Sequence, residues 1–591
     1  MAKRKKRSSD QMDFKFQESD KPDKKTKKRS SGTASKSRKK PQSKSARQKQ
    51  TNRSKKSSSG KSRSPRRRAK VGTAESMAAD QRSISISEFF AKNRHLLGFD
   101  NPRKALLTTV KEAVDNSLDA CEEARILPEL TVEIKQIAEE KFILTITDNG
   151  PGILKKQIPN IFARLLYGSK FHRLRMSRGQ QGIGISAAGM YGLLTTGQPV
   201  RIVSRTNSKK NAHRYHVQVD TAKNKPHIVL DEECDFDLPT GTRVSITLEG
   251  RYQRGKQSVE EYINQTAMAN PHATIRYYAP DGKVYEYERR TDENPFVPQE
   301  IKPHPYGIEV GLLYKMAKDS SYKQLSAFLK NEFSRVSGKI ANRICEKADL
   351  KPTLNPSRVT IKHAERIHAA INDTKIMSPP TNCIGPIGED KLTEGLKRVV
   401  DADFYAASSR NPAVYRGNPF LVEAALAYGF KDSNGSDSDK EPLMRLIRIA
   451  NRVPLLYQQS AGAIYKAVLD TNWRNYSLSQ SKGALPTGPV VLMVHIASVW
   501  VPFTSESKEA IAHYPEIIKE IQLAVQECGR KLGRYLRKQK RIRHEESKRH
   551  YIETYLPYIG EALQEILELK DNQVNGIIER LDKVLDKSRK I

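Results

Sequence analysis

The sequence Glu112-Ala-Val-Asp-Asn116-Ser-Leu-Asp119-Ala lies within residues 101–127, where apolar residues recur every three or four positions. This spacing predicts a helix. Glu112 and Asn116 are four residues apart, so the helix places both side chains on one face. A carboxylate there can act as general base on a water, and a carboxamide oxygen can bind a magnesium ion that bridges phosphates. Taken alone, the pattern fits a solvated helix with ordinary polar contacts better.

A second stretch, Asp148-Asn-Gly150-Pro-Gly152, follows a predicted strand over residues 142–147. A carboxylate at the end of a strand can accept a hydrogen bond from the exocyclic amine of adenine. Glycines beside it let the backbone approach a flat ligand closely. Alone, this stretch is better explained as a plain turn, because Asn-Gly is among the commonest turn signals.

A third stretch, Gly179-Gln180-Gln181-Gly182-Ile183-Gly184-Ile185, is a glycine-rich loop that runs into a predicted helix. Backbone N–H groups in such a loop can hold phosphates. Gly182-x-Gly184-x-x-Ala187 also matches the dinucleotide fingerprint, but that motif requires a preceding hydrophobic strand and residues 173–181 are polar. The chain has no Gly-x-x-x-x-Gly-Lys-Ser/Thr sequence, which excludes a P-loop ATPase.

The three stretches follow each other at separations of about thirty residues. Together they resemble the GHKL ATP-binding fold shared by gyrase-type topoisomerases, Hsp90 chaperones, MutL proteins and histidine kinases. The resemblance implies a Bergerat-type α/β sandwich that binds ATP and Mg²⁺. It implies that Glu112 is the general base, Asn116 the magnesium ligand and Asp148 the adenine reader. The other nucleotide-binding positions that it implies are Gly152, Gly179, Gln180, Gln181, Gly182, Ile183, Gly184, Ile185 and Thr242.

Further segments resemble the B subunit of DNA topoisomerase VI in particular. They are residues 90–94, 99–105, 303–307, 387–390, 494–498 and 502–511. In that family a transducer lysine contacts the terminal phosphate of ATP, and Lys508 matches it. A compact cation suits that role because it neutralises charge on the γ-phosphate. Ser169 and Lys170 match positions that line the nucleotide pocket.

Trp473-Arg474-Asn475-Tyr476 resembles an element that contacts DNA in the family. An aromatic pair flanking a cation suits contact with the DNA backbone. A buried Trp/Tyr pair that anchors a loop explains the same residues equally well. Lys315, Lys318, Lys323 and Lys330 are open to two interpretations as well, a DNA-binding face or an ordinary solvated one.

The expected fold is an α+β multidomain protein. We expect a basic disordered tail at 1–80, a GHKL ATP-binding α/β sandwich at 81–300 and a helix–two-turns–helix domain at 301–385. An α/β transducer domain with a long C-terminal stalk helix is expected at 386–591. Two apolar stripes predict helices inside the third region. They are Leu325, Phe328, Leu329, Phe333 and Val336, then Ile340, Ile344 and Ala348.

The chain carries a net charge of +37 over 591 residues, and residues 1–70 hold 28 Lys and Arg against 5 Asp and Glu. So basic a tail, poor in large apolar residues, is expected to be disordered and to bind a polyanion, with a solubilising or targeting role as the alternative. Five cysteines without Cys-x-x-Cys pairs argue against a disulfide framework or zinc site. With no apolar run of membrane length, we expect a soluble, cytoplasmic, nucleoid-associated protein, or a nuclear one in a eukaryote.

The resemblance implies the ATP-hydrolysing subunit of a type IIB topoisomerase. ATP would dimerise two copies of the chain through the ATP domain and so gate the passage of one DNA duplex through another. A separate A subunit, docked at the C-terminal stalk, would cut the double-stranded DNA. Two alternatives remain at this point: a MutL-like DNA-repair ATPase, and a non-catalytic DNA-binding clamp.

Overall fold

The computed structural model describes residues 74–79, 81–170, 173–179, 182–430, 442–505 and 508–588. The chain divides into two units, residues 1–81 and 82–591. The described part of the first unit is mainly one short helix, α1 (Ala74–Ala79). Most of the predicted basic tail therefore lies outside the described residues, as do Gln180 and Gln181. The second unit contains both sheets and the helices that pack on them.

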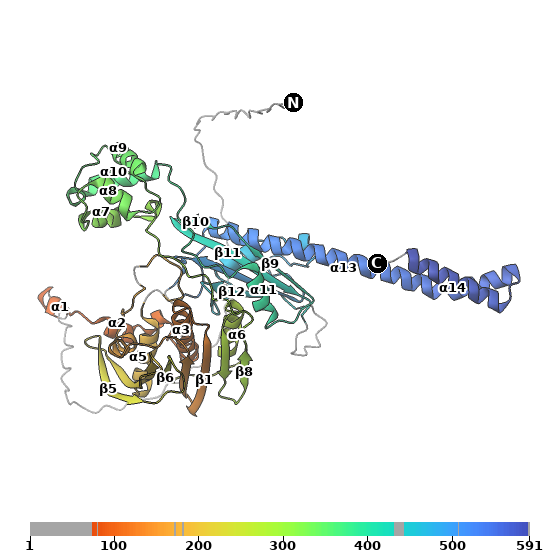
Figure 1. Ribbon diagram of the computed structural model, residues 1–591, viewed down its shortest axis with the longest axis horizontal. Helices are drawn as coiled ribbons and strands as arrows, with labels where there is room; N and C mark the ends of the chain where they lie inside the picture. Colours follow the sequence, from red (N-terminus) through yellow and green to blue (C-terminus); the bar gives the residue numbers. More distant parts are fainter. Residues whose placement is uncertain are drawn as a thin grey trace, which may run out of the picture. The chain divides into compact units, whose positions relative to one another are not determined.

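The first part of this unit is built on an eight-stranded sheet with the order β5-β4-β3-β6-β2-β1-β7-β8 (Figure 1). Neighbouring strands are antiparallel except for β1 and β7, which are parallel. The strands are β1 (Glu129–Ala138), β2 (Lys141–Asp148), β3 (Val200–Arg205), β4 (Ala212–Asp220), β5 (Lys225–Cys234), β6 (Gly241–Glu249), β7 (Thr274–Tyr278) and β8 (Val284–Tyr287).

Helices cover one face of this sheet because the strands alternate in burial. In β2, Phe142, Leu144 and Ile146 are buried and join one core with the apolar faces of α3, α5 and α6. Such alternation is the pattern of a sheet packed on one side. The helices and turns of this part are α2 (Ile86–Lys92), η1 (Arg94–Leu97), α3 (Pro102–Glu123), η2 (Lys155–Gln157), α4 (Ile158–Ala163), α5 (Gly184–Thr196) and α6 (Val259–Ala269).

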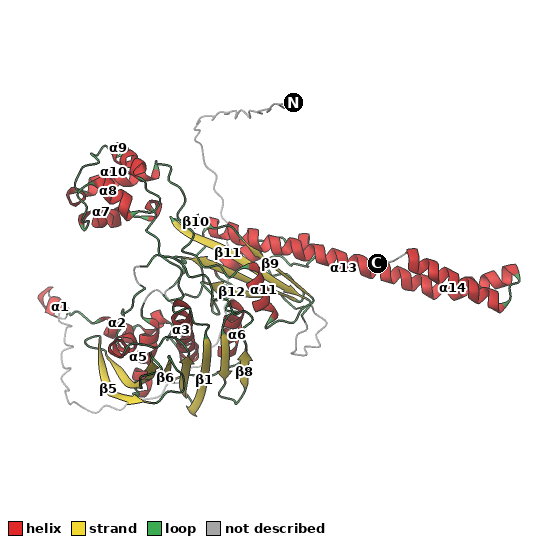
Figure 2. Ribbon diagram, viewed as in Figure 1, coloured by secondary structure: helices red, strands yellow, loops and turns green. Residues whose placement is uncertain are grey.

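Residues 305–372, which we name the helical module, consist of helices, turns and loops alone (Figure 2). Its core contains every residue of the two predicted stripes, with Ile340 partly buried at its edge. Ser337 begins the third helix by accepting a hydrogen bond from the N–H of Ile340, which satisfies one of the free donors of the first turn. The elements are η3 (Pro305–Gly307), α7 (Val310–Lys318), α8 (Leu325–Glu332), α9 (Gly338–Lys347), η4 (Pro356–Arg358) and α10 (Ile361–Asn372).

A second, six-stranded sheet follows, with the order β10-β11-β14-β12-β13 and β9 paired to β11. Its strands are β9 (Phe404–Ser409), β10 (Ala413–Tyr415), β11 (Asn418–Tyr428), β12 (Arg445–Ala450), β13 (Val453–Pro454) and β14 (Val490–Ser498). All nine residues of β14 are buried. Val490, Leu492 and Val494 face α12 (Gly462–Leu469) and α13 (Pro515–Leu567), whereas Val491 and Met493 face α11 (Glu389–Lys397). Burial on both faces explains why β14 reads as one continuous apolar run.

Helix α13 is 53 residues long, and its first five turns pack on this sheet through Ile517, Ile521, Val525 and Leu532. The sequence predicts helix from about 508 and further helix over 555–591; α13 begins at Pro515 and runs through Pro557 to Leu567. A turn then leads into α14 (Asp571–Ser588), which lies alongside the end of α13, where Gly560 contacts Ile578. Among the described residues, no helix is both long and apolar enough to cross a membrane.

Two paired strands of the second sheet bury an acid and a histidine side by side. Glu423 on β11 lies opposite His495 on β14, and Nδ1 of His495 is 2.8 Å from Oε2 of Glu423. Both side chains are fully buried. Glu423 also accepts hydrogen bonds from the N–H groups of Ile387 and Gly388, so it fixes the chain that leads into α11. Nε2 of His495 accepts a hydrogen bond from the N–H of Arg452, which requires a neutral imidazole with its proton on Nδ1.

This pair predicts loss of stability in mild acid. Burial lowers the pKa of His495 despite the opposing effect of Glu423. Burial would raise the pKa of Glu423, but His495 and the two N–H groups hold it below its ordinary value. Since both folded pKa values lie below the unfolded ones, the unfolded chain binds more protons and stability falls as pH falls. For His495 the loss begins near its unfolded pKa of about 6.5 and reaches at most about 1.4 kcal/mol per pH unit.

Thermal unfolding of the full chain between pH 8 and 5, compared with a His495→Asn variant, checks this expectation. The variant starts less stable, but its melting temperature should fall less steeply below about pH 6.5, because the buried group that excludes a proton is gone. Equal slopes for the two proteins would contradict a contribution from His495.

Candidate functional site: a nucleotide cavity closed by the second sheet

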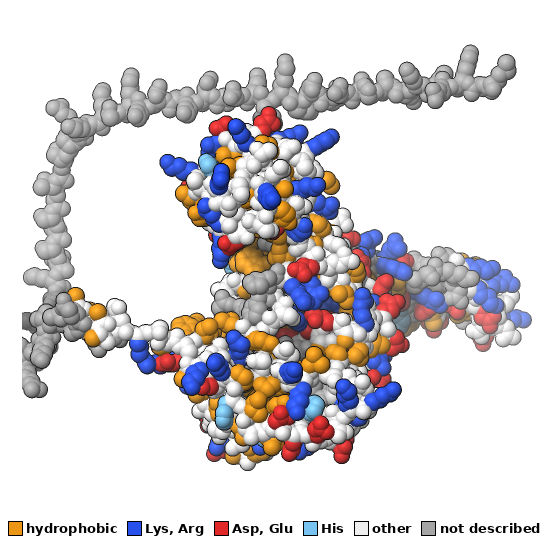
Figure 3. All heavy atoms as spheres, turned by 60° about the vertical axis from the view of Figure 1, so that its left-hand side comes forward, with side chains coloured by type: hydrophobic (Ala, Val, Ile, Leu, Met, Phe, Trp, Pro, Cys, Tyr) orange, Lys and Arg blue, Asp and Glu red, His pale blue; other side chains and the backbone are white. Residues whose placement is uncertain are grey.

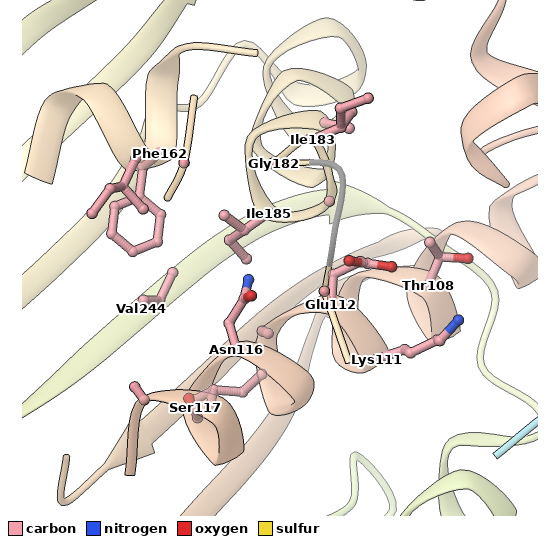
Figure 4. A pocket seen from close by; sticks show the side chains of 18 of the residues that line it. Thr108, Lys111, Glu112, Asn116, Ser117, Phe162, Gly182, Ile183, Ile185 and Val244 are labelled. Carbon is pink, nitrogen blue, oxygen red and sulfur yellow. The ribbon is translucent and has the colours of Figure 1, made fainter. Parts of the chain in front are cut away.

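Helix α3 presents the first predicted motif to a cavity of about 660 Å³. The helix begins at Asn101, whose side chain accepts a hydrogen bond from the N–H of Lys104. Along the helix, Asp115 and Ser117 are buried, whereas Asn116 between them is exposed. Glu112 and Asn116 both project into the space between α3 and α5 (Figure 4). The structure therefore brings these two predicted residues together at the wall of one cavity.

The other described residues that were predicted to bind nucleotide also line this cavity. They come from the ends of strands, from the glycine-rich loop and from the second sheet's domain. They are Asp148, Gly152, Ser169, Lys170, Gly179, Gly182, Ile183, Gly184, Ile185, Thr242 and Lys508. Gln180 and Gln181 lie outside the described residues.

Asp148 is held in one orientation at the closed end of the cavity. Its Oδ1 accepts hydrogen bonds from the N–H groups of Gly150 and Thr242, at 3.0 and 3.2 Å, and its Oδ2 accepts one from Ser117 Oγ at 2.9 Å. Burial raises the pKa of this carboxyl, although the three donors oppose the rise. Ile146 and Val244 supply apolar surface beside it. A hydrogen-bond acceptor fixed next to apolar surface can bind a flat ring, because the ring packs on the apolar surface while a donor on its edge bonds to the acceptor.

Two glycines at this cavity let the backbone come close to other parts of the protein. Gly152 has φ +71°, and a Cβ there would lie 2.1 Å from the carbonyl oxygen of Arg205. Gly184 begins α5, and a Cβ on it would lie 1.8 Å from Oε2 of Glu112. Glycine is therefore required at 184 because the Glu112 carboxylate occupies the space that a side chain would fill.

Lys508 reaches the cavity from the domain of the second sheet. Its backbone is left-handed, with φ +53°, and its Nζ donates a hydrogen bond to the carbonyl oxygen of Arg178 at 3.4 Å. Burial lowers the pKa of Lys508, while Glu112 is the largest of the opposing influences. The ammonium group thus stands where two domains meet, close to the base of the glycine-rich loop.

Sequence reasoning missed an ionic cluster at the end of α3. Arg178 is buried and bonds to Asp119, to both oxygens of Glu122 and to Asn270. Burial would raise the pKa of Glu122, but Arg178 and His272 hold it well below its ordinary value. Lys170 completes the cluster through Asp119 at 2.6 Å, so it contacts both the cluster and the cavity. The polar character of residues 173–181 gave no sign that one of them would be buried.

The segment Pro454–Tyr457, which begins at the last residue of β13, was missed as well. It lines the cavity, and Lys104 lies 5.2 Å from the centre of the Tyr457 ring. Lys104 also pairs with Glu509 at 2.5 Å, next to Lys508. A local motif cannot reveal these contacts, because they join segments that are hundreds of residues apart in the sequence.

The predicted DNA-contact element needs a correction at Trp473. This residue begins η5 (Trp473–Tyr476), is fully buried in the core below α13, and donates a hydrogen bond from Nε1 to the carbonyl oxygen of Val468. Tyr476 is partly buried against Gly529 of α13. Burial rules out contact of the Trp473 side chain with DNA in this arrangement and favours the loop-anchoring interpretation. Arg474 is exposed, and its guanidinium donates to the carbonyl oxygen of Gln480.

Two family models match the chain over this architecture. Residues 101–251 match the histidine kinase-, DNA gyrase B- and HSP90-like ATPases, which gives the class: the first domain is a GHKL ATPase domain, and it binds ATP. Residues 379–548 match the transducer of the topoisomerase VI B subunit.

Curated relatives narrow the class to one family. The type 2 DNA topoisomerase 6 B subunit of Methanococcoides burtonii is 45% identical over 509 residues, which cover 86% of this chain and 81% of that one. The corresponding B subunit of Archaeoglobus fulgidus is 45% identical over 506 residues, covering 85% and 83%. The chain belongs to the family of type 2 DNA topoisomerase 6 B subunits. The expected fold class is confirmed, and the MutL-like and non-catalytic alternatives gain no support.

Proposed function

We propose that this chain hydrolyses ATP at the α3 cavity and uses the nucleotide to close a two-copy gate around DNA. One observation carries the proposal: Glu112 and Asn116 of α3 line the same cavity as Lys508, which belongs to another domain. A site completed by two domains can change their relative position when its ligand changes. The family membership supports a partner subunit and dimerisation.

In the proposed reaction, Glu112 accepts a proton from a water whose oxygen attacks the γ-phosphorus. The bond from that phosphorus to the bridging oxygen breaks, and ADP and phosphate are released. Lys508 balances charge on the γ-phosphoryl group, Asp148 accepts a hydrogen bond from adenine, and Thr242 supports Asp148 through its N–H group. Gly179–Ile185 would close over the phosphates, and Ser169 and Lys170 would line the pocket.

A magnesium ion fits the residues present. The described residues contain no cluster of three or more His, Cys, Asp or Glu that could hold a metal by itself. Magnesium bound together with phosphates needs few protein ligands, because phosphate oxygens and waters complete its coordination. Asn116, exposed into the cavity between buried neighbours, would hold the ion through its side-chain oxygen. When bound, Mg²⁺ would neutralise charge on the phosphates.

The proposed partners are double-stranded DNA and a DNA-cleaving A subunit. The A subunit would bind at the far end of α13 and α14. The protein would act on nucleoid DNA in the cytoplasm. Several basic side chains support DNA binding. Lys315, Lys318, Lys323 and Lys330 are exposed on the helical module, and Figure 3 shows Lys and Arg side chains spread over this lobe. Together with Arg474, they offer charge that a polyanion can contact.

We place the domain limits at 81–300, 301–385 and 386–591, each with its own apolar core.

Relaxation of supercoiled DNA by this chain together with its A subunit tests the proposal. We expect relaxation with ATP and Mg²⁺, and none with either omitted. The chain alone should hydrolyse ATP slowly and leave DNA uncut. A folded complex that binds DNA but shows no ATP-dependent relaxation would overturn the proposed function.

A further inference from the structure

The residues directly before the glycine-rich loop, Leu174–Arg178, form what we name the pre-lid segment. Its backbone bonds to chain far away in the sequence. The N–H of Ile301 donates to the carbonyl oxygen of Leu174 at 3.1 Å, and the N–H of Met176 donates to the carbonyl oxygen of Cys383 at 2.9 Å. Ile301 precedes η3, the first element of the helical module, and Cys383 follows α10, its last helix. The pre-lid segment is therefore bonded to both connections of that module.

Met176 inserts its side chain into a small apolar cluster outside the three domain cores. It is buried, and its partners are Cys383 and Ile384 from the module's exit and Leu421, Ala497 and Val499 from the second sheet's domain. Its Sδ accepts a hydrogen bond from the N–H of Gly385 at 3.3 Å. Among the described residues, Met176 and the partly buried Leu174 are the ATP domain's contribution to this cluster. One side chain thus packs against two other domains at once.

Two consecutive carbonyl groups of the same segment accept hydrogen bonds from the second sheet's domain. Asn451 Nδ2 donates to Ser177 O at 3.1 Å, and Lys508 Nζ donates to Arg178 O. The Asn451 amide is itself fixed, because it exchanges hydrogen bonds with the N–H and carbonyl of Ser498 at 2.9 Å each. Its backbone has φ +48°, a conformation that asparagine tolerates better than most residues.

The Arg178 side chain points the opposite way, into the ATP domain. There it makes the buried ionic bonds to Asp119 and Glu122 on the helix that carries Glu112 and Asn116. Breaking a buried pair of this kind leaves an uncompensated charge, so the segment and α3 should move as one body. The five residues of the pre-lid segment therefore connect α3, both connections of the helical module and the transducer. They lead directly into the glycine-rich loop.

We propose that the pre-lid segment transmits closure of the glycine-rich loop over ATP to the helical module and the transducer, with Met176 and Asn451 as positioning residues. This inference rests on the proposed function, since it assumes that the loop closes on nucleotide. Packed clusters pass on small shifts because they repack between discrete arrangements and do not deform continuously. Linkage requires the coupling to be reciprocal. If bound ATP shifts the conformational equilibrium of the module and the transducer by a certain factor, a shift of that equilibrium changes the affinity for ATP by the same factor.

Amide hydrogen exchange of the full chain, with and without a non-hydrolysable ATP analogue, tests the inference. Two peptides are compared: one covering the loop at 179–190 and one covering the module's exit at 379–388. In the wild type we expect the analogue to slow exchange in both by at least about fivefold. In Met176→Ala the loop peptide should still be protected, while protection of the exit peptide should fall to less than about twofold. Met176→Leu, which preserves volume, should restore it.

Two further variants keep the result interpretable. Leu329→Ala truncates a fully buried side chain in the core of the helical module and should leave both protections intact. Asn451→Gly keeps the left-handed backbone but removes the amide, so it should weaken exit protection even if Met176→Ala does not fold. Protection of the exit peptide equal to wild type in Met176→Ala or Asn451→Gly would overturn the inference, as would a wild type protected at the loop alone. No protection of the loop in the wild type would instead contradict the proposed function.

Discussion

Glu112→Gln is expected to lower ATP turnover by roughly 10²–10⁴-fold, the usual contribution of a general base. The substitution keeps the shape of the side chain and removes its ability to accept a proton. Its neighbours hold that shape tightly, since the Glu112 carboxylate fills the space beside Gly184 at the start of α5. Nucleotide affinity should change by less than about threefold, because the substitution leaves untouched the hydrogen bonds that hold Asp148, the proposed adenine acceptor.

Steady-state phosphate release and calorimetric ADP binding separate these two effects. Glu123→Gln is the matched control, because Glu123 lies on the same helix but does not line the cavity. It should retain turnover within about twofold. Turnover of Glu112→Gln within tenfold of the wild type would assign the base to another residue.

Lys508→Met is expected to reduce turnover by about 10²–10³-fold, comparable to the loss of one preorganised donor to a transition-state oxygen. Methionine keeps the length and apolar stem of the side chain, so the loss reports the charge. The effect should depend on the terminal phosphate. Affinity for ADP should stay within about threefold, whereas affinity for a non-hydrolysable ATP analogue should fall at least tenfold.

A second readout concerns the interface between domains, because Lys508 belongs to the transducer and donates to Arg178 of the ATP domain. Analogue-dependent dimerisation, measured by light scattering, should require at least tenfold more nucleotide in Lys508→Met. Lys519→Met, which removes an exposed lysine from α13, should behave as the wild type. Equal dimerisation of Lys508→Met and wild type would exclude a role for this lysine in sensing the γ-phosphate.

Local patterns predicted much of the ATP domain and the helical module from sequence. The spacing of Leu106, Val110 and Val114 predicted α3, and the alternation in 142–147 predicted β2, because one buried face imposes a simple period. The strands β7 and β8 were missed, since they are short, with five and four residues, and β8 lies at the edge of the sheet. The residue pattern also left Trp473 open, because an aromatic residue beside a cation looks the same whether it is buried or exposed.

The residues of the candidate site also differ in how far local sequence patterns could predict them. Motifs with fixed spacing predicted Glu112, Asn116 and Asp148 as neighbours at one ligand, and the cavity contains all three. Arg178, Asn451 and Met176 carry no local signature, because their partners are brought together by the packing of three domains. Lys508 was identified through the resemblance of its flanking sequence, and periodicity alone would not have selected it.

The length of α13 has a consequence for how small movements at the transducer are magnified. Its base is held by the second sheet as far as Leu536. Beyond this residue the helix continues to Leu567, which at 1.5 Å per residue is an arm of about 45 Å. Tilting the base by about 5° would sweep the far end through about 4 Å, the width of one step between neighbouring Cα atoms. Because α14 packs along the outer part of this arm, it stiffens the helix. A tilt that begins beside the nucleotide would therefore displace the tip and would not merely bend the helix.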